Sequence, residues 1–227
     1  MPDRVVPFSG LTPEERQRIP RPNWVVQTTS GEQIPDWSEV YDPGWATISH
    51  IAVINNETGR IFDKIDLHAD GRGVFVVVFR RRGEKIEFLL PEERRVLLKD
   101  ENGQQGNVYV KNIPQGQVRF WEHEDPKEAA LREVKEETGL EPISIQQIGE
   151  VYFSTSNSHT KSPFFLAEVD ATELKYQQSL GEDEDIKVGD KDWYAIEDIP
   201  TLELQCKDTL AGLFLATGFL GLWNKDK

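Results

Sequence analysis

The stretch that most constrains the fold is residues 125–140, which read DPKEAALREVKEETGL. Asp125 is a residue type that caps helix N-termini, and Pro126 suits the first helical position. Glu128 stands three residues after the cap, where its side chain can complete a capping box. Gly139 supplies the left-handed residue that commonly ends a helix. The sequence therefore predicts a helix of about three turns here.

The predicted helix has an acidic side and an apolar side. Glu133, Glu136 and Glu137 are spaced i, i+3 and i+4, which places them on one face. The neighbouring side, expected to turn toward the core, carries Ala130, Leu131 and Val134. A solvated acidic face is the ordinary interpretation of such a pattern. A site for Mg²⁺ or Mn²⁺ accounts better for the convergence, because a divalent ion removes the repulsion between the carboxylates and can bridge to phosphate oxygens.

Residues 132–140, REVKEETGL, resemble the core of the Nudix box, whose family pattern is G-x5-E-x7-R-E-U-x-E-E-x-G-U with U aliphatic. The second half of the pattern matches at every fixed position, and Glu124 stands eight residues before Arg132 as the pattern requires. The first half departs from it. The glycine of the pattern falls on Val118, whereas the nearest glycine is Gly116, which implies a longer loop before the helix.

The resemblance implies an α/β fold, the Nudix α/β/α sandwich with a mixed sheet, here with an N-terminal β subdomain. We assign residues 1–68 to an N-terminal arm and strand subdomain and residues 69–227 to the Nudix hydrolase domain. The run VFVVVF at 74–79 predicts a strand buried on both faces. Residues 46–54 and 60–68 flank a turn sequence and predict a hairpin. Residues 204–223 predict a C-terminal helix.

The resemblance also implies Mg²⁺-dependent (or Mn²⁺-dependent) hydrolysis of a nucleoside diphosphate linked to another moiety. Glu133 and Glu137 are the leading metal ligands, and Glu136 is either a third ligand or a bridge through water. Gln115 is expected to offer its backbone carbonyl to a metal. Arg132 is expected to pair with a glutamate and so hold the acidic cluster in place.

Beyond the box, the chain is most similar to ADP-ribose and nucleoside-diphosphate-sugar pyrophosphatases. Arg94 corresponds to their substrate-facing arginine, although Arg95 is an alternative. In the acidic stretch GEDEDI at 181–186, the resemblance assigns Glu182 as general base and Glu184 as a further metal contact. Asn112 stands where related chains often carry an acidic residue.

Two other functions stay open at this stage. A nucleoside triphosphate or dinucleoside polyphosphate hydrolase of the same family is kept open by the departures at Val118 and at Thr160, which stands where these pyrophosphatases usually carry a glutamate. The second open function is that of a regulator with the same fold and no turnover, although the intact glutamates of the box count against it.

Composition restricts the partners. The net charge of −14 argues against binding to nucleic acid or to an anionic membrane surface, so the expected partner is a small nucleotide. The single cysteine excludes an intrachain disulfide, and no apolar leader stands at the N-terminus, which together predict a cytoplasmic protein. An arm of this length, with little core of its own, predicts a homodimer.

Overall fold

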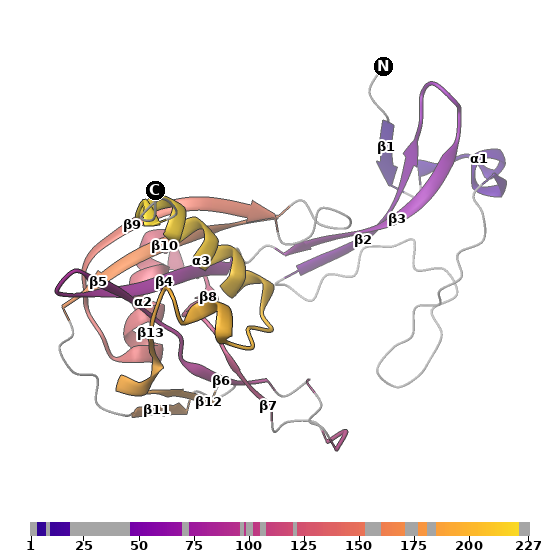
Figure 1. Ribbon diagram of the computed structural model, residues 1–227. Coiled ribbons are helices and arrows are strands. Elements are labelled where there is room, and N and C mark those ends of the chain that lie inside the picture. The colour runs from indigo at the N-terminus through magenta and orange to yellow at the C-terminus, as the bar shows by residue number, and fades with distance from the viewer. Residues whose placement is uncertain are drawn as a thin grey trace. The chain divides into compact units, whose positions relative to one another are not determined.

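The computed structural model describes most of the chain in two compact units (Figure 1). The described residues are 4–7, 10–18, 46–69, 73–95, 98, 102–104, 108–119, 122–152, 160–170, 177–180 and 185–222. Unit 1 comprises residues 1–71 and 152–161, and unit 2 comprises residues 72–151 and 162–227. Glu182 and Glu184 lie outside the described residues.

Unit 1 contains a small antiparallel sheet of order β1-β2-β3. Its elements are β1 (Arg4–Pro7), α1 (Pro13–Gln17), β2 (Ala46–Ile54) and β3 (Ile61–Ala69). The predicted hairpin is confirmed, and its turn is closed by Asn55, whose side-chain oxygen accepts a hydrogen bond from the Thr58 amide at 2.8 Å. Among the residues of this unit whose burial is described, the buried apolar ones are Leu11, Ala52, Ile54 and Ile61.

Unit 2 is built on a mixed six-stranded sheet, because β4 pairs parallel with β10 and antiparallel with β5 and β8. Its strands are β4 (Gly73–Arg82), β5 (Lys85–Leu89), β8 (Gln115–Gln117), β9 (Pro142–Tyr152), β10 (Lys161–Val169) and β13 (Trp193–Ala195). A second sheet has the order β11-β12-β6-β7, with β6 (Glu92–Arg95), β7 (Val108–Lys111), β11 (Gln177–Leu180) and β12 (Asp185–Val188). The helical elements are α2 (Pro126–Thr138), α3 (Lys207–Phe219), η3 (Asp190–Asp192) and η4 (Ile199–Thr201).

The central strand β4 separates two cores, as its uninterrupted apolar sequence predicts. Val74, Val76 and Val78 belong to the core that α2 covers, whereas Val77 and Phe79 belong to the core that α3 covers. This alternation follows from the two-residue period of a strand. The result is the predicted α/β/α sandwich, with the two helices on opposite sides of the mixed sheet (Figure 1).

The C-terminal helix is shorter than predicted. It begins at Lys207 rather than Leu204, because Cys206 has extended backbone angles (φ −93°, ψ 123°). It ends at Phe219, two residues before Gly221, whose φ of 67° lies in the left-handed region. Among the described residues, none of the helices combines the length and the apolar character that crossing a bilayer demands.

Candidate active site

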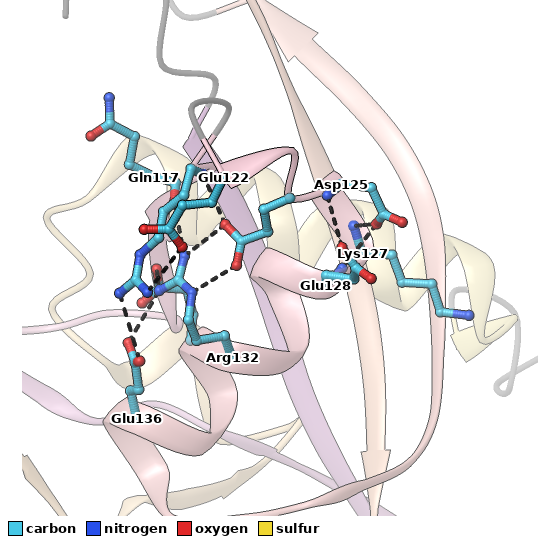
Figure 2. Close-up of polar contacts among 10 residues, drawn as sticks. Gln117, Glu122, Asp125, Lys127, Glu128, Arg132 and Glu136 are labelled. Carbon is cyan, nitrogen blue, oxygen red and sulfur yellow. Dashed lines mark hydrogen bonds and ion pairs between the residues drawn. The ribbon is translucent and has the colours of Figure 1, made fainter.

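The acidic helix α2 forms as the sequence predicts. Asp125 accepts hydrogen bonds from the amides of Lys127 (2.8 Å) and Glu128 (3.0 Å), and the Glu128 carboxylate accepts one from the Asp125 amide (3.1 Å), which completes the capping box (Figure 2). Gly139 ends the helix with φ 68°. These local signals fix where the helix starts and stops, and therefore where its glutamates stand.

Two of the three glutamates are buried, which the sequence did not indicate. Glu133 and Glu137 are 7% and 6% exposed, whereas the Glu136 side chain is 51% exposed. Strand β8 covers the buried pair, since the Gln115 amide donates to Glu137 Oε1 at 3.2 Å. A β-carbon at Gly116 would lie 1.8 Å from Glu133 Oε1. Only glycine leaves room for that carboxylate.

This contact resolves the departure in the first half of the box. Gly116 is the glycine that faces the acidic helix, although it stands two positions before Val118, where the pattern places it. Val118 is fully buried in the core beneath α2. The longer loop before the helix therefore keeps the glycine next to the glutamates.

Arg132 ties the acidic cluster together, as expected. Its Nε donates to Glu124 Oε1 at 2.8 Å, and its Nη1 donates to Glu133 Oε1 at 2.5 Å and to Glu136 Oε2 at 3.1 Å. Its Nη2 donates to the backbone carbonyl of Gln117 at 2.9 Å and to Glu124 Oε2 at 3.2 Å. Figure 2 shows the guanidinium reaching Glu136 from one turn earlier on the helix. One side chain thus connects the helix, the loop before it and β8.

Glu124, the first glutamate of the box, acts through this arginine. The pKa of Glu124 is lowered from its ordinary value, chiefly because Arg132 donates a hydrogen bond to the carboxylate, and the pKa of Arg132 is raised for the same reason. The Arg119 amide also donates to Glu124, at 2.8 Å. Sequence reasoning placed Glu124 in the motif without giving it a role, since the residue lies before the helix cap and makes its contacts only through tertiary folding.

The donor set suits a hard divalent cation. Glu133 and Glu137 both set carboxylate oxygens against β8, and oxygen is the donor that Mg²⁺ and Mn²⁺ prefer. Within the described ranges, no three His, Cys, Asp or Glu side chains are gathered closely enough to hold a metal ion by themselves. The Gln115 carbonyl, Glu136 and Glu184 stay predicted as further metal contacts.

The acidic stretch 181–184 connects two strands that pack beside the helix. Strands β11 and β12 pair antiparallel, with Leu180 opposite Asp185, and both strands contact α2. Glu182 and Glu184 themselves lie outside the described residues. Their roles as base and metal contact stay predictions.

Strand β6 separates the two arginines that the sequence left as alternatives. Arg94 is exposed, whereas Arg95 lies on the opposite face of the strand, where its Nη2 is 2.7 Å from Glu93 Oε2. The two arginines thus differ in exposure and in the face of the strand they occupy, and the assignment of Arg94 to substrate contact stays a prediction.

The fold and the site resemble those of a known protein family. The chain is an α/β/α sandwich whose glutamate-rich helix packs against a glycine. A family model described as NUDIX domain matches residues 69–211. The match spans more than half of the chain, so the chain belongs to the NUDIX domain family. The sequence resemblance is thereby confirmed, as is the enzyme class that it implied, a Nudix pyrophosphohydrolase.

Solved structures include two neighbours of interest. One, described as the crystal structure of an ADP compounds hydrolase, shares 16% identity with a TM-score of 0.56 and covers 80% of this chain and 89% of that chain. The other is the NUDIX domain of Shewanella oneidensis NrtR complexed with ADP ribose, with 19% identity, a TM-score of 0.45, and coverage of 65% and 86%. Among curated proteins, none matches. The first neighbour supports the fold.

Proposed function

We propose that the protein hydrolyses the pyrophosphate bond of a nucleoside diphosphate linked to another moiety, of the ADP-ribose or nucleotide-sugar type, with Mg²⁺ or Mn²⁺. The observation that carries the proposal is the buried pair Glu133 and Glu137, held against Gln115 and Gly116. Buried carboxylates are costly unless hydrogen bonds, cations or metal ions compensate their charge. A phosphate-bridging metal site explains why this fold buries two of them on adjacent turns.

The residues that would hold the metal are Glu133, Glu137 and the Gln115 carbonyl, with Glu136 and Glu184 as further contacts. When bound, the divalent ions screen the diphosphate charge and lower the pKa of the attacking water. Arg132 orients Glu133 and Glu136 through its hydrogen bonds. It acts on the glutamates rather than on the substrate.

The reaction is a displacement at one phosphorus. The water oxygen forms a new bond to phosphorus while the bond to the bridging oxygen breaks, and the bridging oxygen leaves with the electron pair on the departing phosphate. Glu182 accepts the proton from the water. The products are two monophosphates, which for ADP-ribose are AMP and ribose 5-phosphate.

A cationic sheet face supports an anionic substrate. The register of β6, β7 and β12 places Arg94, Lys111 and Lys187 on one face, together with Tyr109 and Glu92. Lys187 Nζ lies 3.6 Å from the centre of the Tyr109 ring, and Lys111 Nζ lies 3.5 Å from Glu92 Oε1. In a chain of net charge −14, such a local excess of cations favours a phosphate-bearing ligand.

Hydrolysis assays test the proposal directly. The fold neighbour is described as an ADP compounds hydrolase, so ADP-ribose and other ADP compounds are the first substrates to try. The panel should add nucleotide sugars, dinucleoside polyphosphates and nucleoside triphosphates, each with Mg²⁺ or Mn²⁺. We expect AMP and ribose 5-phosphate from ADP-ribose, and no products with EDTA. Turnover of triphosphates alone would contradict the substrate class, and tight nucleotide binding without turnover would favour a regulator.

A further inference from the structure

A chain of buried polar side chains lies behind the candidate metal site. Glu93 on β6, Asn112 just after β7 and Thr209 on the first turn of α3 are 6%, 2% and 0% exposed. Asn112 Nδ2 donates to Glu93 Oε2 at 2.6 Å, and Thr209 Oγ1 donates to Asn112 Oδ1 at 2.5 Å. Asn112 therefore joins a strand of the second sheet to the helix on the far side of the sandwich.

The hydrogen bonds of Asn112 leave it little freedom. Its side-chain Oδ1 also accepts a hydrogen bond from the Ile113 backbone amide at 3.0 Å, and its backbone N–H donates to the Pro91 carbonyl at 3.0 Å. Burial raises the pKa of Glu93, against the opposing effects of the hydrogen bond from Asn112 and the charge of Arg95. A buried network in which the partners satisfy one another resists local rearrangement, because breaking any bond exposes the desolvation cost of the group left behind.

Asn112 stands three residues before Gln115, whose backbone is part of the proposed metal site. Asn112 is followed by Ile113 and by Pro114, whose carbonyl accepts from the Val76 amide at 2.8 Å. Gln115 comes next, with its amide on Glu137. The Gln115 backbone is therefore held at one end by the pairing of β8 with β4 and at the other by Asn112.

We propose that Asn112 is a positioning residue for the metal site, and that its bonds to Glu93 and Thr209 orient the Gln115 backbone carbonyl toward the acidic helix. This inference rests on the proposed function, since the Gln115 carbonyl is one of the proposed ligands.

An exchange of the amide and the acid tests the proposal. Asn112→Asp alone sets two carboxyl groups against each other at the 2.6 Å contact, and at a pH high enough to ionise both, their repulsion displaces residue 112. Asn112→Asp combined with Glu93→Gln restores one amide and one carboxylate, and the aspartate still accepts from Thr209 and Ile113. Affinity for Mn²⁺, measured from the electron paramagnetic resonance of the free ion, is the readout.

We expect Asn112→Asp to weaken Mn²⁺ binding by about 10- to 100-fold, the usual effect of losing a residue that orients a metal ligand, and the double variant to recover most of it. Thr209→Val should weaken binding less, and Thr209→Ser should bind like the wild type, because it keeps the hydroxyl.

A matched control separates positioning from stability. Glu87→Gln removes the charge of one of the carboxylates that pair with the buried Arg80, which lies 2.7 Å from Glu87 on the neighbouring strand and 3.1 Å from Asp190. It should lower the melting temperature without changing Mn²⁺ affinity. Wild-type affinity in Asn112→Asp, or equal weakening in Glu87→Gln, would overturn the inference. So would a double variant that fails to recover. If the wild type binds Mn²⁺ and these variants behave as expected while no nucleoside diphosphate is hydrolysed, the proposed function fails and the inference stands.

Discussion

Replacing Gly116 by alanine isolates the contact between β8 and the acidic helix. The new β-carbon would lie 1.8 Å from Glu133 Oε1, 2.0 Å from its carboxyl carbon and 2.5 Å from Oε2. Ordinary contact begins near 3.4 Å, so the nearest oxygen must retreat by the difference, about 1.6 Å. The atoms that clash are the far end of one flexible side chain, and the backbone of Gly116 need not move.

The expected effects on stability and on activity therefore differ. Because Gly116 does not need a positive φ, alanine restricts the unfolded chain and offsets part of the cost of moving Glu133. We expect the free energy of unfolding to change by no more than about 1 kcal/mol. A displacement larger than 1 Å at a proposed metal ligand should lower kcat/KM by about 10²-fold or more and weaken Mn²⁺ binding in parallel.

The assay compares Gly116→Ala with a control, with Glu133→Gln and with the double variant under the same conditions. Gly73→Ala is the control, because its β-carbon would come no closer than 3.7 Å to the Gly116 carbonyl in the neighbouring strand. It should keep wild-type kcat/KM. Gly116→Ala combined with Glu133→Gln should be no worse than the more damaging single variant, since both changes act on one carboxylate. Normal turnover by Gly116→Ala, or full additivity in the double variant, would refute the assignment of Glu133.

Three further predictions follow from the same site, and a fourth concerns assembly. Glu137→Gln should lower turnover by at least about 10²-fold while leaving the melting temperature unchanged or higher, and near-normal turnover in Mg²⁺ would refute its role as a ligand. Glu182→Gln should lower kcat by roughly 10²–10⁴-fold with little change in KM, as for a positioned base. Normal turnover there together with an inactive Glu136→Gln would move the base onto the helix. Arg132 lowers the folded-state pKa of Glu124 below its ordinary value of 4.5. The stability that Glu124 contributes is therefore fully present above pH 4.5 and is lost as the pH falls through the folded-state pKa. Denaturant unfolding of Glu124→Gln should therefore show a shallower loss of stability below about pH 4.5 than the wild type, and identical acid profiles would contradict the pairing. Away from the site, sedimentation at micromolar concentration should show the homodimer expected from the N-terminal arm, and a monomer would contradict that expectation.

The parts of this protein that could be predicted are those governed by neighbours in the sequence. Helix α2 begins and ends where its caps place it, because Asp125, Glu128 and Gly139 act on backbone groups within one turn. The buried strand β4 could be predicted from its uninterrupted apolar run for a similar reason. The motif predicted that Arg132 would pair with a glutamate, but not that its closest contact with Glu124, at 2.8 Å, would lie outside the helix.

The sequence by itself thus determined the helix, its acidic face and the family, because these depend on short-range periodicity and spacing. Tertiary structure alone decided that Glu133 and Glu137 are buried, since only the pairing of β8 with β4 sets Gly116 against them. It also decided the partner of Asn112, because Thr209 is 97 residues away and no periodicity connects them. A polar contact across such a separation depends on how the elements pack, and packing is a property of the whole sandwich.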